Sequence, residues 1–321
     1  MFTIRPFADN AADYAALSAL IGAIWPDRAV AVVAQQHFDQ ARRAGHFFQR
    51  YLLSSAGAPV GYCECGEPAD SYRPGKYAFD IGVLPGWRGR GLGAALYDHL
   101  VGEVSQRPLP LTMLACRTRE DRAETVHFLQ KRGFEQVMRS PIAVLDVAQF
   151  DFAQVAGAVA QVTESGLQLV SLAELPALDP HWQERVYELD WECTLDEPLP
   201  DTPTKMPFAH YAGEVFGNPD FLPEAWFVAI DHGRYVGMTA TNRNATNPQQ
   251  LDTIFTGVVR SHRRRGIAKA LKGLAIDYAH RHGYQVIKTD NEEHNPMFQI
   301  NLALGFQPEP ALLFFQKVFP M

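Results

Sequence analysis

The 321-residue sequence has little cysteine, no excess of positive charge and no long apolar run. Its four cysteines form no Cys-x-x-Cys pair, so we expect neither a disulfide framework nor a metal site. A formal net charge of −7 argues against a general binder of nucleic acid or of anionic membranes. No stretch approaches the roughly 18 apolar residues of a membrane span, and the first residues lack the pattern of a secretory signal. We expect a cytoplasmic monomer or homodimer that contacts neither membrane nor nucleic acid.

Two common nucleotide-binding signatures are also missing. The sequence contains no GxxxxGK[ST], so a nucleoside-triphosphate P-loop is unsupported. It contains no Rossmann GxGxxG after an opening strand either. What the sequence does contain is 47% hydrophobic residues over 321 positions, which is enough for two buried cores.

One short motif occurs twice, each time between a strand-like run and a helix-like run. Residues 88–93 (RGRGLG) and 263–268 (RRRGIA) both read R-x-x-G-x-(G/A). A Gly-Phe pair follows each motif, and its glycine lies 45 residues after Arg88 in one half and 42 residues after Arg263 in the other. An ordered set of features at matching distances predicts a duplicated domain.

The repeat sets the expected domain boundaries. Both halves open with a strand-like run, a helical segment and a hairpin pattern. Between them, residues 151–166 place apolar side chains at helical spacing and end at a glycine that suits a helix C-terminus. We therefore expect an N-terminal domain over residues 1–150, a linker helix over 151–166 and a C-terminal domain over 167–321.

Each motif is predicted to open an amphipathic helix. The first turn of a helix presents unpaired N–H groups and the positive end of the helix dipole, which together bind phosphate. Glycine lets phosphate oxygens approach the backbone because it has no Cβ, and arginines add charge at the rim. We interpret the basic stretch RSHRRRG (residues 260–266) as a pyrophosphate cradle rather than a DNA-binding patch.

This motif, opening a helix after a fourth strand and followed by Gly-Phe, resembles motif A of the GCN5-related N-acetyltransferase (GNAT) superfamily. The resemblance covers essentially the whole chain as a tandem pair. It implies an α/β (α+β) fold of two domains, each a mixed, mostly antiparallel twisted sheet flanked by helices, in which the fourth and fifth strands splay apart. It also implies acetyl-CoA as the cofactor and a small-molecule or peptide amine as the acceptor.

The same resemblance assigns residues to the cofactor. In this family the loop amides hold the pyrophosphate of acetyl-CoA, amides at the end of the fourth strand face the thioester, and a polar residue after the fifth strand bonds the pantetheine. The residues assigned in this way are Val83, Leu84, Arg88, Gly89, Arg90, Gly91, Leu92 and Gly93 in the first half, and Val258, Val259, Arg263, Arg264, Arg265, Gly266, Ile267, Ala268 and Asn291 in the second.

The catalytic groups implied by the resemblance are less complete. Many family members carry a carboxylate that acts as the general base, six residues before the last valine of the fourth strand. At that position this sequence has Asp252 in the second half and Tyr77 in the first. An ordinary strand-end carboxylate is the alternative for Asp252. A tyrosine often stands four residues before the glycine of Gly-Phe and protonates the thiolate, but Leu129 and Asn301 occupy those positions. Asn301 can donate a hydrogen bond but cannot act as an acid.

These residues favour the second half as the catalytic one. We expect an acetyl-CoA-dependent N-acetyltransferase that acts on a primary amine by direct attack, with a degenerate first half. Asp80 offers no clear replacement base there, since strand alternation places it on the opposite face from Val83 unless a bulge intervenes. The alternative is a non-catalytic acyl-CoA binder or sensor.

Two interpretations remain open for Asn291, for Asn301 and for an acidic segment. Asn291 is either a pantetheine contact or a helix N-cap, and Asn301 is either part of the site or a residue on a solvated helix face. The acidic segment LDWECTLDEPLPD (residues 189–201) lies where the family tends to border its acceptor, which would suit a cationic amine. A solvated loop is the alternative for this segment.

Overall fold

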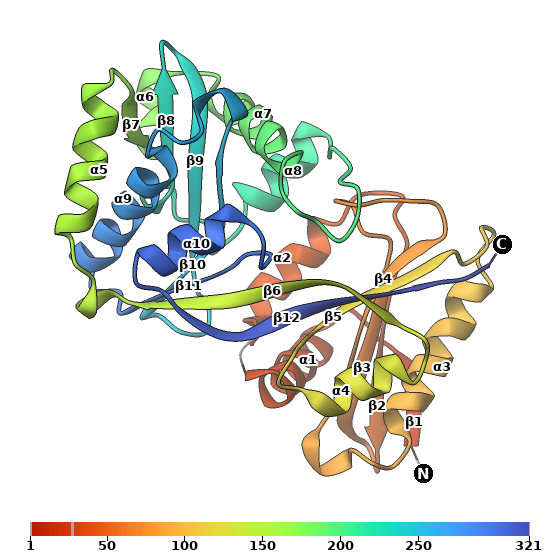
Figure 1. Ribbon diagram of the computed structural model, residues 1–321. Helices are drawn as coiled ribbons and strands as arrows, with labels where there is room; N and C mark the ends of the chain where they lie inside the picture. The colour runs from red at the N-terminus through yellow and green to blue at the C-terminus, as the bar shows by residue number, and fades with distance from the viewer. Residues whose placement is uncertain (1, 27–28, 321) are drawn as a thin grey trace. The chain divides into compact units, whose positions relative to one another are not determined.

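The computed structural model describes residues 2–26 and 29–320, and these form two compact units (Figure 1). Unit 1 consists of Met1–Met138, Pro200–Met206 and Leu313–Met321. Unit 2 consists of Arg139–Leu199 and Pro207–Leu312. Within the described residues, no helix has the length and apolar character needed to cross a bilayer.

Unit 1 is a mixed sheet with helices. Its elements in chain order are β1 (Phe2–Pro6), α1 (Ala11–Ile24), α2 (Val32–Gln40), β2 (Phe48–Ser55), β3 (Ala58–Gly66), β4 (Lys76–Val83), η2 (Pro85–Trp87), α3 (Leu92–Ser105), β5 (Met113–Arg119) and α4 (Ala123–Gln130). The strand order is β1-β2-β3-β4-β5, in which β1 to β4 pair antiparallel and β4 pairs parallel with β5.

Unit 2 repeats this plan. Its elements are η3 (Val147–Gln149), α5 (Ala153–Glu164), β7 (Gln168–Ser171), α6 (Leu175–Leu178), α7 (Trp182–Thr194), α8 (Phe208–Val215), η4 (Pro223–Ala225), β8 (Phe227–Asp231), β9 (Arg234–Arg243), β10 (Gln250–Val258), η5 (Arg260–His262), α9 (Ile267–Arg281), β11 (Val286–Asp290) and α10 (Pro296–Ala303). Strands β7 to β10 pair antiparallel, and β10 pairs parallel with β11.

Each half of the sequence contributes a final strand segment to the unit built mainly from the other half. Strand β6 (Glu135–Asp146) crosses into unit 2 and pairs antiparallel with β11 over Ile142–Asp146. The end of β12 (Gln307–Val318) belongs to unit 1, where Leu313 and Phe315 are buried in its core. The spatial units therefore do not coincide with the sequence repeats, and the boundaries at 150 and 166 stay a prediction.

The parallel pair separates part-way along its length in both units, as the resemblance implies. Pairing of β4 with β5 stops at Ala78, although β4 continues to Val83. Pairing of β10 with β11 stops at Asp252, although β10 continues to Val258. One edge of each long strand is therefore left without a neighbouring strand near the end that leads into the glycine loop.

The two long strands differ by one residue. The register of β10 against β9 shifts between Thr253 and Phe255, so Ile254 is a bulged residue and is 60% exposed. Strand β4 pairs with β3 without such a shift. Counting six residues back from the last valine of each strand therefore compares positions that are not equivalent. The position in unit 1 that corresponds to Asp252 is Ala78 and not Tyr77, because Asp252 and Ala78 are the last residues of their strands to pair with the parallel neighbour.

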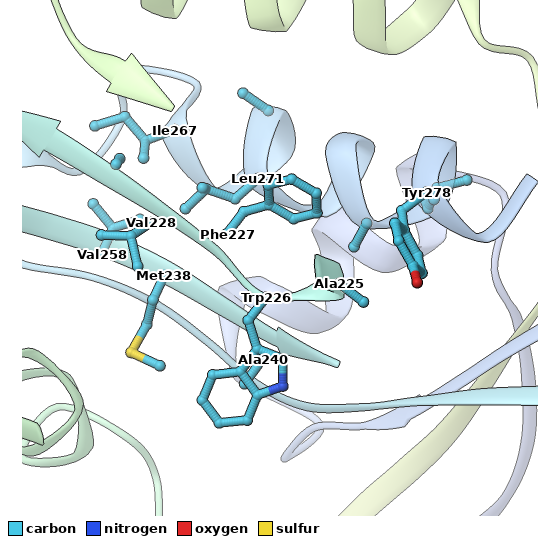
Figure 2. Close-up of a cluster of buried hydrophobic side chains, with 14 of the residues drawn as sticks. Ala225, Trp226, Phe227, Val228, Met238, Ala240, Val258, Ile267, Leu271 and Tyr278 are labelled. Atoms are coloured by element: carbon cyan, nitrogen blue, oxygen red, sulfur yellow. The ribbon is translucent and has the colours of Figure 1, made fainter. Parts of the chain in front are cut away.

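The core of unit 2 forms where α9 covers the sheet. Figure 2 shows Phe227 of β8 beside Leu271 of α9, with Ile267 and Tyr278 on the same helix, whereas Met238 of β9 points away from α9; all five are buried. The spacing of the three helix residues keeps them on one face.

The segment between the repeats forms helix α5, which packs against α9 within unit 2. A Cβ added to Gly273 of α9 would lie 1.8 Å from Val155 of α5, so this glycine allows the two helices to approach closely.

We predict that unit 1 depends on the exchanged end of β12. Phe315 is 1% exposed in the unit 1 core, so Phe315→Ala should lower the free energy of unfolding by about 3–5 kcal/mol through loss of buried contacts. Hydrogen exchange should then rise in β4 and α3. Val318→Ala, at a 69% exposed position of the same strand, is the matched control. Faster hydrogen exchange confined to unit 2 would contradict the assignment of the end of β12 to unit 1.

Candidate functional site

The glycine loops begin their helices in the same unusual conformation. Gly91 and Gly266 are the N-caps of α3 and α9, with φ of 77° and 81°. Neither helix has a side-chain hydrogen bond at its N-cap, so the first-turn N–H groups have no capping acceptor. A Cβ at Gly91 would meet nothing within 4 Å, and one at Gly266 would meet nothing closer than 3.8 Å. Each loop thus presents free donors beside open space, which fits a phosphate group.

A second residue of each loop is also left-handed. Gly89 has φ of 74°, and Arg264 at the same motif position has φ of 60°. A residue with a Cβ pays roughly 1–2 kcal/mol for this conformation, so the bend is held in unit 2 against a steric penalty. The two loops therefore share a backbone path that the motif alone did not specify.

The first arginine of each motif fixes the loop to the strand before it. Arg88 donates from Nε to the carbonyl oxygen of Val83 at 3.2 Å, and Arg263 donates likewise to Val258 at 2.9 Å. This side chain acts as an internal clamp, a role that the expectation of a charged rim did not include. Arg264 and Arg265 are exposed, and Arg264 lines the adjacent cavity.

A cavity opens beside each loop. The unit 2 cavity measures about 620 Å³ and the unit 1 cavity about 380 Å³. The residues assigned to the cofactor that line them are Val258, Arg263, Arg264, Gly266, Ile267, Ala268 and Asn291 in unit 2, and Val83, Arg88, Gly89, Gly91, Leu92 and Gly93 in unit 1. The assigned residues outside these linings are Leu84, Arg90, Val259 and Arg265.

The N–H groups of Val258, the last residue of β10, and of Val259, which follows it, point to opposite edges of the strand. The N–H of Val259 donates to the carbonyl of Val236 at 3.0 Å, and that of Leu84 in unit 1 donates to Val60 at 2.9 Å. These two amides are engaged by the neighbouring strand. Alternate amides of a strand point to opposite edges, so the N–H groups of Val258 and Val83 face the unpaired edge.

Comparison with known proteins accounts for this arrangement. The family model described as "Acetyltransferase (GNAT) family" matches residues 13–134 and 183–303. The chain belongs to the GNAT acetyltransferase family. A search of curated proteins finds no significant match.

Solved GNAT structures share the whole fold. A tandem GNAT protein from the clavulanic acid biosynthesis pathway has 19% identity and a TM-score of 0.76, over 100% of both chains. A GCN5-related N-acetyltransferase from Sphaerobacter thermophilus has 18% identity and a TM-score of 0.69, over 99% of this chain and 95% of the other. A glucosamine N-acetyltransferase region of a fungal multi-domain β-N-acetylglucosaminidase has 12% identity and a TM-score of 0.70, over 99% of this chain and 38% of the other. At these identities the likeness establishes the tandem GNAT fold alone.

Asp252, the carboxylate suggested by the resemblance, lies outside the residues that line the GNAT cavity of unit 2. Its two oxygens accept amide hydrogen bonds, from Asn244 Nδ2 at 2.8 Å and from Gln250 Nε2 at 2.7 Å. The role of Asp252 as a base stays a prediction.

Asn301 and Asn291 lie together at the cavity. Asn301 is fully buried, so it is not on a solvated helix face, and its Nδ2 donates to Asn291 Oδ1 at 2.6 Å. No partner for Asn301 Oδ1 is found among the described residues. The N-cap of α10 is Asn295, which accepts from Met297, so Asn291 is not that helix's N-cap. In unit 1 the buried Leu129 stands in place of Asn301, and Thr118, which lines the cavity, stands in place of Asn291.

The acidic segment over residues 189–201 runs from the last turns of α7 into a loop, where Asp196 and Glu197 line the unit 2 cavity. Asp196 accepts from Arg260 at 2.7 Å and from Arg263 at 2.6 Å, and these bonds hold the pKa of its carboxyl below the usual range. Asp196 thus ties the end of α7 to the glycine loop. The sequence showed the charges of both segments but not that they meet.

Glu197 lies beside Asp196 and lines the unit 2 cavity. Burial, followed by the charges of Asp190 and Asp290, raises its pKa to about 7. Asp290 ends β11 and also lines the cavity. A carboxyl group that titrates near neutrality therefore faces the space beside the separated strands.

Packing of α7 on β10 fixes where Glu197 lies. A Cβ added to Gly257 would lie 2.7 Å from Cβ of Cys193, so the last turn of α7 rests directly on β10, one residue before Val258. The N–H of Glu197 donates to Thr194 in that same turn, at 3.1 Å. The glutamate is therefore held close to the unpaired edge of β10.

Unit 1 holds its cavity carboxylate differently. The Tyr62 hydroxyl donates to Asp80 at 2.8 Å, and Trp25 Nε1 donates to that hydroxyl oxygen at 3.0 Å. Asp80 and Trp25 both line the smaller cavity, and β4 reaches it without a bulge. The indole of Trp25 therefore occupies part of the wall on the side of Asp80.

We predict that Asp196 keeps the unit 2 loop ordered. Asp196→Asn removes the charge that pairs with Arg260 and Arg263, so amide exchange over residues 260–266 should become faster by hydrogen-exchange mass spectrometry. Glu192→Gln, which removes the carboxylate of α7 that pairs with Arg234 of β9, is the control and should leave this segment unchanged. Unaltered exchange in Asp196→Asn would show that the ion pairs do not order the loop.

Proposed function

We propose that this GNAT protein transfers the acetyl group of acetyl-CoA to a primary amine by direct attack, and that unit 2 is the catalytic unit. One observation carries the proposal. A single cavity in unit 2 joins the uncapped N-terminus of α9, the unpaired edge of β10 and the carboxyl group of Glu197. These are the three elements that acetyl transfer to an amine requires: a phosphate anchor, donors for the thioester oxygen and a proton acceptor.

The residues present would hold acetyl-CoA along this cavity. The N–H groups after Gly266 would bind the pyrophosphate, with Arg264 and Lys269 at the rim. The N–H of Val258 would donate to the thioester oxygen, and Asn291 would bond the pantetheine. Acetyl-CoA supplies an activated acyl group, and the protein supplies its position and the groups that move protons.

Glu197 is the base that the geometry supports best. It lines the cavity, and no hydrogen bond or ion pair is found for its side chain within the described part of the chain. A base with a pKa near the working pH is also the most effective. Asp252, in contrast, is held by two amides away from the cavity lining. We therefore propose Glu197 as the base and retain Asp252 as the competing assignment.

The carboxylates near the cavity suggest a cationic acceptor. The charges of Asp190 and Asp290 both act on Glu197, and burial raises the pKa of Asp190 to about 6. A second positive charge on the acceptor would relieve this repulsion. The panel for testing activity should therefore contain polyamines, basic peptides and amino sugars, with uncharged primary amines for comparison.

Unit 1 fits the alternative, a CoA-binding unit without turnover. Its loop is intact, but its cavity is smaller and Tyr62 bonds its carboxylate, Asp80. Leu129 provides neither a proton nor a hydrogen bond. We propose that unit 1 binds acetyl-CoA without transferring the acetyl group.

The two loop glycines offer a matched test of this assignment. Gly91→Asp and Gly266→Asp each place a Cβ and a negative charge at a left-handed N-cap, so the backbone strain is the same in both. On an amine found active, Gly266→Asp should reduce turnover by more than about 100-fold through loss of cofactor binding, and Gly91→Asp should retain it. The opposite pattern would place catalysis in unit 1, and no heat on titrating acetyl-CoA into the wild type would refute the function itself.

The competing bases differ in the pH profile that they predict. Glu197 must lose a proton to act, and its pKa is raised to about 7, so kcat/KM should fall as the pH drops through 7. Glu197→Gln should remove this limb and lower kcat by about 100-fold to 10,000-fold, with acetyl-CoA affinity nearly unchanged. Asp252→Asn is the matched variant and should keep the limb. Loss of the limb in Asp252→Asn alone would restore Asp252 as the base.

A further inference from the structure

Lys272 is a buried cation without a compensating anion. It lies on α9, is 4% exposed and lines the unit 2 cavity. Within residues 2–26 and 29–320, no hydrogen bond or ion pair is found for its Nζ, whose nearest recorded contact is the Phe306 ring, 5.8 Å from the ring centre. Burial alone lowers the pKa of Lys272, to about 8. An ammonium group in this position is costly unless an anion accompanies it.

The same helix position in unit 1 has an ordinary core residue. Tyr97 lies six residues after Gly91, as Lys272 lies six after Gly266, and its ring packs 6.1 Å from that of Phe134. Phe134 and Phe306 are the phenylalanines of the two Gly-Phe pairs. The fold therefore accepts an uncharged side chain here, and packing does not explain the lysine.

The depth of Lys272 separates it from the phosphate loop. Lys272 lies three to five residues beyond the N–H groups of residues 267–269 that would hold the pyrophosphate, which corresponds to about 4.5–7.5 Å along the helix axis. Its neighbour Phe306 donates its N–H to the carbonyl of Asn301 at 3.1 Å. The side chain of Asn301 in turn bonds Asn291 at the cavity wall. The ammonium group thus lies beside the ring of Phe306, at the residue that follows α10 and its Gly305 turn.

The other charged groups of the cavity do not pair with Lys272. Glu197 and Asp290 line it from the α7 end and from β11, and Arg264 and Lys269 line it from the loop and the first turn of α9. None of them contributes to the shift of the Lys272 pKa, which burial alone causes. Within the described residues, the protein therefore supplies no anion for Lys272.

We propose that Lys272 pairs with the negative charge that forms on the sulfur of CoA as the acetyl group leaves, an inference that rests on the proposed transfer reaction. As the amine nitrogen bonds to the acetyl carbon, the carbon–sulfur bond breaks and its electron pair stays on sulfur. The ammonium group of Lys272 keeps its proton and pairs with this thiolate, while Glu197 accepts the proton released by nitrogen. Glu197 then gives that proton to solvent, and the thiolate takes one from solvent as CoA is released, so that the protons balance.

The test measures the thiol of bound CoA, which does not depend on turnover. Free CoA is titrated with pH in the presence of protein, and thiolate is followed by its ultraviolet absorbance. An ammonium group beside the sulfur should lower the thiol pKa by one unit or more in the wild type. Lys272→Met, which keeps the shape and removes the charge, should return the thiol pKa to its value in solution. It should also lower kcat by about 100-fold or more.

Lys269→Met is the matched control, because it removes a lysine of the same cavity from the first turn of α9. It should leave the thiol pKa of bound CoA at the wild-type value. Lys272→Met should fold, since loss of a buried charge raises the melting temperature below pH 8.

Three results would overturn the proposal. An unshifted thiol pKa in the wild type, or a shift that persists in Lys272→Met, would remove Lys272 from the sulfur. Weaker CoA binding by Lys272→Met with unchanged kcat would make it a phosphate contact instead. A wild type that binds no CoA would refute the proposed function and not this assignment alone.

Discussion

The loss of pairing between β10 and β11 after Asp252 is the constraint on which the site depends. It leaves the amide of Val258 without a strand partner while the amide of Val259 stays bonded to β9. The bulge at Ile254 and the packing of Cys193 on Gly257 occur on this same strand. Because the strand leads directly into the glycine loop, one backbone path connects the free donors of the strand to those of α9.

The two carboxylates next to this strand and loop, Asp196 and Glu197, differ in their contacts. Asp196 is used internally, since it pairs with Arg260 and Arg263 and so joins α7 to the loop. Glu197, one residue later, has no such partner and faces the cavity with a pKa raised by burial. Of these adjacent carboxylates, the one that bonds the arginines joins two segments of the fold, and the other is the base that we propose.

The sequence predicted the duplicated domain and the two glycine loops, because these depend on local patterns that repeat at fixed spacing. The splayed strands were implied only by the family that the motif resembles. The sequence could not predict the exchange of β6 and the end of β12, since both units use the same strand pattern. Counting along the sequence also matched Asp252 with Tyr77, because the bulge in β10 adds one residue to that strand and leaves no signal in the sequence. The proposals for Glu197 and Lys272 could not come from the sequence for a related reason: they rest on tertiary burial, which neither charge nor spacing encodes.

The central claim is that acetyl-CoA is bound and used in unit 2, along the path from the unpaired edge of β10 to the first turn of α9. Amide hydrogen exchange with and without acetyl-CoA tests it most directly, because it reports on the individual donors. The account predicts that acetyl-CoA slows exchange at Val258 and at the N–H groups of residues 267–269. Protection confined to the loop of unit 1, or no protection in either loop, would contradict it.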